Sequence, residues 1–322
     1  MTPTQLRAFA AVVRLGSVKA AARDLSVSEA AVSMHVAHLR KQLGDKLFSR
    51  TGAGLAFTPG GLRLASRASE LLGLQDRTIL EVSQAGFGRR LLRVGASSLF
   101  AEYAAPGLIN LFANRADDLD VELSVHSSHQ FPGLLVNRTI DVALGPRPAP
   151  TDDKIACAPF LNYAMVLVVG PQHALAGRPL GTEVSVGELR QQTWLLGPSA
   201  VDRADLATKV LRQINVPEEQ QRIFQSHTAA VEEAKHSKGV ALVLSFAVAQ
   251  DVKAGDLRQL SVPALNARSA WHAATLSGRT APAAAEELVR FVTTPRATQA
   301  MLRGGGVDAG RFRPAIHVTL WS

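Results

Sequence analysis

Residues 17–43 read SVKAAARDLSVSEAAVSMHVAHLRKQL, which is two short helical patterns separated by a tight turn. Ser17 and Ser28 stand directly ahead of the two patterns, where a side-chain oxygen caps the free N–H groups of a helix. In the second pattern an apolar residue recurs every three or four positions, which predicts a buried stripe. The stripe consists of Val32, Val36, Leu39 and Leu43. The spacing predicts a helix-turn-helix.

The opposite face of the second helix is small or polar near its N-terminus, where a recognition helix presents side chains to a DNA major groove. A plain helical hairpin with a solvated face is the alternative. Under the DNA-binding interpretation, the expected contacts from this region are Ser17, Lys19, Ser28, Glu29, Ala30, Ser33, Met34 and His35.

The flanking sequence predicts a winged domain. Thr2, Pro3 and Gln5 form a capping-box pattern that opens an earlier helix, and Gly16 ends it. Residues 50–57 place two glycines between short β-like runs, which predicts a small hairpin. Contacts with phosphates or with the minor groove are expected at the hairpin and at the start of the next helix. They are assigned to Arg50, Thr51 and Thr58.

This N-terminal region resembles the LysR-type transcriptional regulators. The matching residues are Leu6, Phe9, Gly16-Ser17, Ala20-Ala21, Leu25, Ser28, Ser33, Leu39, Leu43-Gly44, Leu47-Phe48, Arg50 and Thr58-Pro59-Gly60. The resemblance continues with less specific motifs to about residue 303. The sequence departs from the family pattern at three positions. Glu29 replaces the usual Gln, Met34 a frequent basic or polar residue, and Arg40 the usual Glu.

The resemblance implies a DNA-binding regulator that is controlled by a small-molecule effector and needs no cofactor. It also implies a tetramer built from dimers, with RNA polymerase as a further candidate partner. Its fold class would be α/β, with an N-terminal all-α winged helix-turn-helix, a long linker helix, and a C-terminal two-subdomain α/β effector domain similar to periplasmic binding proteins.

Composition is consistent with a multidomain cytoplasmic protein. The 322 residues suffice for two or three domains, and 47% hydrophobic content is ample for buried cores. No apolar run approaches the roughly 18 residues that span a bilayer, so no membrane partner is expected. The N-terminus lacks the pattern of a secretory signal, and the lone Cys157 cannot form an intrachain disulfide.

Positive charge is concentrated at the N-terminus. Residues 1–90 contain 13 Lys+Arg and 6 Asp+Glu, whereas the remaining residues contain 22 and 21. A basic surface kept for solubility would explain the sign of the net charge but not this segregation. The distribution favours a phosphate-contacting domain joined to a nearly neutral body.

Thr58 and Pro59 predict the start of a long helix, along which apolar and small residues recur in steps of four and three. In the family the corresponding linker helix pairs with its counterpart to form the dimer. The residues assigned to this contact are Leu64, Ala68, Leu71, Gln75 and Val82. Two-fold symmetry predicts an interrupted palindrome as the operator. The alternative is a helix that packs on its own C-terminal domain.

From Leu91 onward strands and helices alternate, which predicts a mostly parallel sheet. The expected strands are 91–96, 121–125, 141–144, 163–169, 194–196, 240–244 and 271–276. The expected helices are 99–112, 131–137, 186–191, 203–214, 228–237 and 283–291. The predicted domains are a winged helix at 1–58, a linker at 59–90, an effector domain at 91–303 and a tail at 304–322. Within the effector domain, subdomain I comprises 91–161 and 268–303, and subdomain II comprises 162–267.

Ligands of open α/β sheets bind beyond the carboxyl ends of strands, often against helix N-termini. Polar residues follow several of the predicted strands and precede two predicted helices. We therefore assign effector contacts to Ser97, Ser98, Ser128, Arg147, Ser199, His227 and Thr228. Hydroxyl groups with one Arg and one His favour a small polar or carboxylate-bearing effector.

Sequence motifs of hydrolases, phosphate-binding loops, dinucleotide-binding folds and helical metal sites are missing, so no catalytic or metal-binding residue is assigned. Two other functional interpretations stay open. One is a small-molecule-binding protein whose N-terminal domain recruits a protein partner. The other is an architectural DNA-binding protein that does not respond to an effector.

Overall fold

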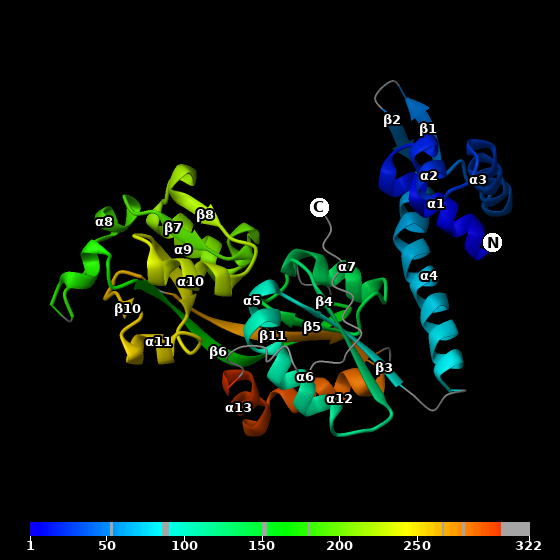
Figure 1. Cartoon of the computed structure of the whole chain (residues 1–322). Helices are drawn as coiled ribbons and strands as arrows, with labels where there is room; N and C mark the ends of the chain where they lie inside the picture. The colour runs from blue at the N-terminus through cyan, green and yellow to red at the C-terminus, as the bar shows by residue number, and fades with distance from the viewer. Residues whose placement is uncertain are drawn as a thin grey trace. The chain divides into compact units, whose positions relative to one another are not determined.

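The computed structural model describes residues 1–51, 54–85, 90–149, 153–179, 181–265, 267–278 and 281–303, with only the backbone at residues 50, 51, 54, 80, 81 and 83–85. The described part therefore excludes residues 86–89 of the predicted linker, the predicted tail at 304–322 and the side chains of Arg50 and Thr51. The chain divides into two compact units (Figure 1). One comprises residues 1–88 with 136–139, and the other comprises the remainder.

The first unit is a winged helix-turn-helix, as predicted (Figure 1). Its elements are α1 (Pro3–Leu15), α2 (Val18–Asp24), α3 (Glu29–Leu43), β1 (Phe48–Thr51), β2 (Gly54–Phe57) and α4 (Pro59–Ala85). The predicted caps are present, because Thr2 forms a capping box with Gln5 and Ser17 accepts a hydrogen bond from the Ala20 N–H. Strands β1 and β2 form the antiparallel hairpin.

Aromatic side chains join the wing to the helices of this unit. Phe9 of α1 is fully buried and stacks on Phe48 of β1, with ring centroids 6.2 Å apart. Arg40 of α3 lies over the same Phe48 ring and donates a hydrogen bond to the Phe48 carbonyl oxygen at 2.7 Å. The departure from the family's Glu at position 40 therefore places a cation where it fastens α3 to the wing.

The predicted buried stripe of α3 is correct for three of its four members. Val32, Val36 and Leu39 are buried, but Leu43 is 45% exposed. The helix ends at Leu43, and Gly44 follows in the left-handed conformation with φ of 65°, which turns the chain away from the core.

Helix α4 belongs to the same compact unit as the winged helix, and the two halves of its predicted dimer stripe differ in burial. Leu64 packs against the winged-helix core and Ala68 is fully buried within the chain. Ala68 is therefore not available to a second copy, which corrects its assignment. Leu71 is exposed and Val82 is 69% exposed. Leu74 and Ile79, which were not assigned to the dimer contact, are also exposed.

The second unit contains a mixed sheet of nine strands with helices packed around it (Figure 1). Its strands are β3 (Arg90–Ala96), β4 (Leu119–Val125), β5 (Val142–Gly145), β6 (Ile155–Val169), β7 (Trp194–Leu196), β8 (Gln221–Ile223), β9 (Val240–Leu244), β10 (Arg258–Gln259) and β11 (Arg268–Leu276). Its α-helices are α5 (Ser98–Tyr103), α6 (Ala105–Ala113), α7 (Phe131–Val136), α8 (Val186–Arg190), α9 (Leu206–Ile214), α10 (His227–His236), α11 (Ala249–Ala254), α12 (Ala283–Val292) and α13 (Pro295–Arg303).

Strands β6 and β11 connect the two halves of this sheet. The strand order is β4-β3-β5-β11-β6-β9-β7-β8, with β10 paired to β6. The pairs β3–β4, β3–β5, β7–β8 and β7–β9 are parallel, whereas β11 and β6 are antiparallel. The early half of β6 pairs with β11 and its later half pairs with β9. The chain therefore passes between two α/β halves along these central strands, as expected for a two-subdomain effector domain.

Two predictions for this unit were wrong in detail, and four of its elements were not predicted. The single helix at 99–112 is two helices, because Pro106 opens a new one within the first turn of α6 and cannot continue the preceding ladder. The strand at 163–169 begins at Ile155, and Pro159 lies at its irregular register with β11. Strands β8 and β10 and helices α11 and α13 were not predicted.

Over the described residues no helix has both the length and the apolar character needed to cross a membrane. The same residues contain no group of three or more His, Cys, Asp or Glu side chains that could hold a metal ion.

Candidate DNA-binding and effector sites

The start of α3 presents a free face. Ser28 caps the helix by accepting a hydrogen bond from the Ala31 N–H at 3.1 Å. Glu29, Ser33 and Met34 are exposed, and Met34 lies on the side opposite the buried stripe. In α3, Ala30 is exposed and His35 is half-buried. In α2, Lys19 is exposed, and the residue that caps this helix, Ser17, is half-buried. The helix-turn-helix thus exposes six of the eight side chains that the sequence assigns to DNA contacts in this region.

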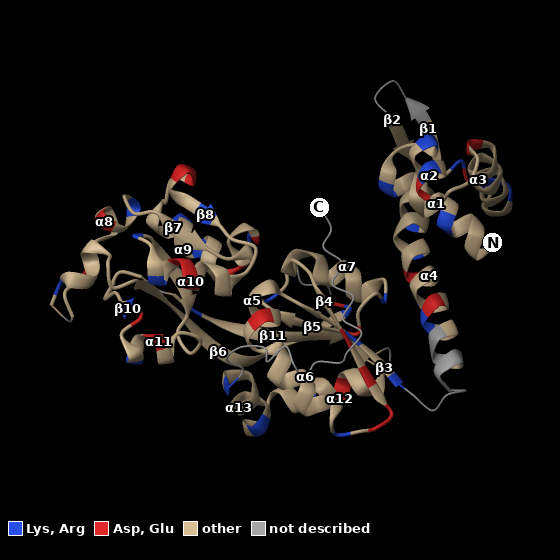
Figure 2. Ribbon diagram, in the orientation of Figure 1, with Lys and Arg blue, Asp and Glu red and all other residues tan. Residues whose placement is uncertain are grey.

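Charge along α3 runs from acidic to basic (Figure 2). Its first turn contains Glu29 and its last turn contains Arg40 and Lys41. Both ends complement the helix dipole. Glu29 differs from the surrounding basic unit, because a carboxylate at the leading end of a recognition helix repels phosphates and can only accept hydrogen bonds.

Thr58 is engaged inside the winged domain. Its hydroxyl donates to Asp45 Oδ1 at 2.6 Å and accepts from the Gly61 N–H at 2.9 Å. The hydrogen bond from Thr58 lowers the pKa of Asp45, and the N–H of Leu47 adds to the effect. Thr58 therefore fixes the start of α4, and its contact with DNA stays a prediction.

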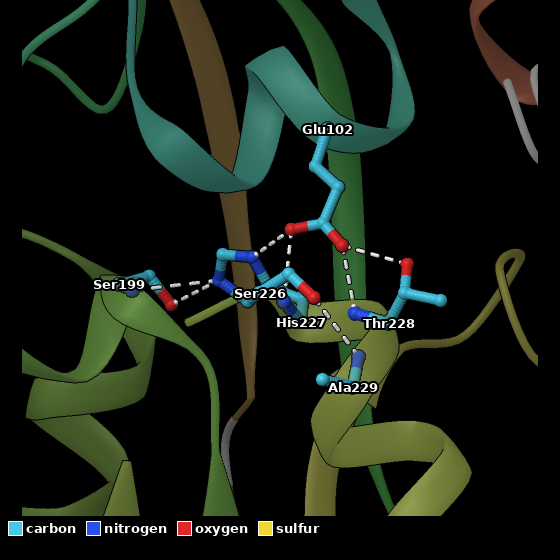
Figure 3. A network of polar contacts seen from close by, with 6 residues as sticks. All are labelled: Glu102, Ser199, Ser226, His227, Thr228 and Ala229. Atoms are coloured by element: carbon cyan, nitrogen blue, oxygen red, sulfur yellow. Dashed lines mark hydrogen bonds and ion pairs between the residues drawn. The ribbon is translucent and has the colours of Figure 1, made fainter. Parts of the chain in front are cut away.

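In the second unit, three of the assigned effector residues meet around Glu102 of α5 (Figure 3). Glu102 Oε2 accepts hydrogen bonds from the backbone N–H of His227 at 2.9 Å and from its ring Nδ1 at 2.7 Å. Glu102 Oε1 accepts from the Thr228 N–H at 2.7 Å and from the Thr228 hydroxyl at 2.6 Å. Ser199 lies on the other side of the imidazole ring, with its hydroxyl oxygen 2.9 Å from Nε2.

The network fixes the imidazole tautomer of His227. A carboxylate can only accept, so Nδ1 must donate to Glu102. The Ser199 N–H can only donate, and it points at Nε2 at 3.4 Å, so Nε2 accepts. The geometry therefore assigns a proton to Nδ1. Gly197 is required beside it, because a Cβ at this position would collide with the His227 ring and backbone.

The pKa of Glu102 reflects two opposing effects. Burial alone would raise it, but the hydrogen bonds from His227 and Thr228 outweigh burial and lower the pKa to about 2. Glu102 is therefore ionised at any physiological pH. A full negative charge sits at the N-terminus of α10, where the free N–H groups of the first turn and the helix dipole stabilise it.

A second contact joins the same two halves of the unit. The backbone N–H of Ser128 donates to Asp202 Oδ2 at 2.7 Å, and the Ser128 hydroxyl donates to the same oxygen at 3.0 Å. Asp202 also accepts from the Ala204 N–H. Both Ser128 and Asp202 are buried. Two carboxylates, one from each half, thus hold the halves together.

The remaining assigned residues lie apart from these contacts. Ser97 is buried at the end of β3, packs close to Gly145, and its hydroxyl has no hydrogen-bond partner among the described residues. Ser98 begins α5 and is half-buried, and Arg147 is exposed after β5.

A buried acid lies near the Glu102 network. Asp205 caps α9 by accepting a hydrogen bond from the Ala207 N–H at 3.0 Å and is 1% exposed. Burial raises the pKa of Asp205 to about 6, although the Ala207 hydrogen bond acts in the opposite direction. Burial also raises the pKa of Tyr163, and the negative charge of Asp205 adds to that shift.

The order Ser199, His227, Glu102 matches the hydrogen-bonded order of a serine-hydrolase triad. Ser199 is only 2% exposed, however, and its own N–H points at the nitrogen that would act as the base. This arrangement suits a structural contact.

Sequence reasoning missed Glu102, Asp202 and Asp205. Glu102 follows Ser98 by four residues, so both face the same side of α5, and this spacing was the available signal. Asp202 and Asp205 both precede α9, where acidic residues usually cap a helix. Their position therefore did not indicate a contact across the domain.

Both regions of the chain match models of one protein family. Residues 3–62 match the "Bacterial regulatory helix-turn-helix protein, lysR family" model, and residues 85–295 match the "LysR substrate binding domain" model. An HTH-type transcriptional regulator of Mycobacterium tuberculosis strain H37Rv, itself uncharacterised, is 55% identical over 100% of both chains. The regulator CbbR of Rhizobium meliloti is 29% identical over 91% of this chain and 92% of its own.

Solved structures share the fold. Full-length CbnR in complex with its target DNA has a TM-score of 0.55 at 20% identity, covering 91% of this chain and 100% of that one. A mutant of Corynebacterium glutamicum OxyR with bound hydrogen peroxide has a TM-score of 0.54 at 21% identity, covering 94% of each chain. Because the family models match both regions and the fold contains the winged helix, the chain belongs to the LysR family and is a DNA-binding transcriptional regulator with an effector-binding domain.

Proposed function

We propose that the chain acts in the cytoplasm as a two-fold reader of an interrupted palindromic operator, with α3 in the major groove of each half-site. The observation that carries this proposal is the exposure of Glu29, Ser33 and Met34 in the N-terminal half of α3, whose Val32, Val36 and Leu39 are buried. The excess of Lys and Arg in the same unit supports the phosphate contacts that such a reader needs.

Dimerisation through α4 supplies the two-fold axis. Leu71, Leu74 and Val82 are exposed apolar residues spaced by three and eight positions, which places them along one side of the helix. Gln75 lies beside them and is half-buried. Covering these side chains with a second copy removes apolar area from water. A tetramer of two such dimers follows the family pattern.

The effector binds between the two halves of the second unit, where Ser199, His227 and Thr228 converge. Hydroxyl, imidazole and backbone N–H groups favour a small polar or carboxylate-bearing molecule. Such a molecule controls transcription if it binds one arrangement of the halves better than another, since only differential affinity shifts a conformational equilibrium. The shift then changes the spacing or the bend of the bound DNA.

Glu29→Gln should change the base preference at one operator position. The carboxylate can accept a hydrogen bond from a cytosine amino group, whereas Gln pairs with adenine through two hydrogen bonds. Selection of random oligonucleotides followed by sequencing should show that the preference for C is relaxed or moved towards A. Non-specific affinity should not fall, because the change removes a charge that repels phosphates. An identical base preference in the two proteins would refute the assignment.

Arg50→Ala should weaken binding to all DNA sequences alike. A wing arginine on a phosphate contributes about one released counterion, so the slope of log affinity against log salt should become shallower by about one. Titration by fluorescence anisotropy at several salt concentrations measures that slope. Arg290→Ala, which removes an exposed arginine of α12 in the other unit, is the matched control. A loss confined to one operator base would contradict the phosphate role.

A further inference from the structure

The Glu102 carboxylate occupies a site that is built for a two-oxygen anion. Each of its oxygens accepts two hydrogen bonds, one from a backbone N–H and one from the side chain of the same residue, His227 or Thr228. The third free N–H of the first turn, that of Ala229, is already bonded to the Ser226 hydroxyl. The N–H groups at the start of α10 thus all have hydrogen-bond partners when a carboxylate is present, and two of them lose their partner without it (Figure 3).

The occupant comes from the opposite half of the domain. Glu102 lies on α5, which follows β3, whereas His227 and Thr228 open α10, which contacts β7 and β9. The tethered carboxylate therefore bridges the two halves. Its side chain is 23% exposed and Thr228 is exposed, so the bridge lies where solvent and small solutes reach it.

We propose that Glu102 is a resident ligand of the effector site, and that a small carboxylate effector acts by replacing it on His227 and Thr228. The inference rests on the proposed effector control and adds its mechanism. The incoming carboxylate takes over the four donors, Glu102 turns to solvent, and the bridge between α5 and α10 is broken. Effector binding therefore removes a link between the two halves. The effector binds the arrangement without this link better than the arrangement with it, and a switch requires such a difference in affinity.

The two-oxygen geometry selects the class of ligand. Four donors arranged in two pairs match the two oxygens of a planar carboxylate. The competition also sets the affinity. A tethered carboxylate acts at an effective concentration in the millimolar range or above, so a free carboxylate binds the intact chain much more weakly than a chain without Glu102.

The test is chemical rescue in the full-length Glu102→Ala protein, with sodium acetate as the probe and hydrogen exchange of residues 226–232 as the readout. We expect exchange of these amides to rise about tenfold in the variant, because the N–H groups of His227 and Thr228 lose their hydrogen bonds to Glu102. Acetate should restore the protection. It should leave the unaltered protein unchanged at the same concentration. Sodium chloride and sodium sulfate at equal ionic strength should not restore protection.

Two further variants make the result specific. Glu122→Ala removes an exposed acid from β4 and should respond to none of the salts. Glu102→Gln keeps the shape of the side chain, and its raised exchange at residues 226–232 serves as the test if the alanine variant does not fold. Unchanged exchange in a folded Glu102 variant would overturn the proposal, as would protection of the unaltered protein by acetate. Equal protection by sulfate would overturn the carboxylate class. Because no DNA is present, these results are independent of operator binding, whose loss would refute the proposed function alone.

Discussion

Phe9→Ala should lower the free energy of unfolding of the winged-helix unit by about 3–5 kcal/mol, the usual cost of truncating a buried phenylalanine. Phe9 is fully buried and stacks on Phe48, which also supports Arg40. The loss is a large part of the roughly 5–15 kcal/mol that stabilises a typical domain. We expect faster hydrogen exchange throughout residues 3–57 and a collapse of DNA retention.

The tryptophans make this prediction selective. The described tryptophans, Trp194 and Trp271, both belong to the second unit, and their fluorescence should not change in the Phe9 variant. Leu15→Ala, an exposed position on the same helix, should cost only about 0.5 kcal/mol. A Phe9 variant with unaltered exchange in residues 3–57 would show that the aromatic contact does not support the unit.

Asp205→Asn should stabilise the effector domain at neutral pH by about 2–3 kcal/mol. In the folded protein the pKa of Asp205 is raised to about 6 from an ordinary value of 3.8, so the folded state holds the proton more tightly than the unfolded state. Ionisation therefore destabilises the domain progressively as the pH rises from about 4 to about 6, and fully above that. Asn keeps an oxygen that can accept from the Ala207 N–H but carries no charge.

Urea unfolding followed by tryptophan fluorescence at pH 7.5 and pH 4.5 measures the effect. The difference between variant and unaltered protein should be largest at pH 7.5 and should fall to about 1 kcal/mol at pH 4.5. Asp256→Asn, on the surface after α11, should be as stable as the unaltered protein at each of the two pH values. A variant that is less stable at pH 7.5 would mean that the ionised carboxylate is stabilised by its surroundings.

The sequence was most informative where structure depends on neighbours in the chain. Thr2, Ser17 and Ser28 cap the helices they were predicted to cap, since capping involves residues only two or three positions apart. The same local reasoning failed at Pro106, where a continuous apolar pattern concealed a break between α5 and α6. It also failed at α13, which begins at Pro295 after the Thr294 cap, a signal that was present and not used.

The network around Glu102 could be predicted only in part. Ser199, His227 and Thr228 were singled out because they follow strands or precede helices, and the structure joins them in one network. Their acidic partner Glu102 is 125 residues from His227 in the chain, and its spacing of four from Ser98 on α5 does not indicate which distant residue it contacts. For the same reason Ala68 was assigned to the dimer, although the fold buries it.

Two-fold recognition of an operator can be tested by DNA selection with the full-length protein, in which the retained oligonucleotides are sequenced at two salt concentrations. We predict an interrupted palindrome at both concentrations, because two α3 helices related by a two-fold axis read two half-sites. Retention should decline as salt rises, without a change in the motif. Salt-sensitive retention without any motif, or no retention at low salt, would contradict two-fold recognition.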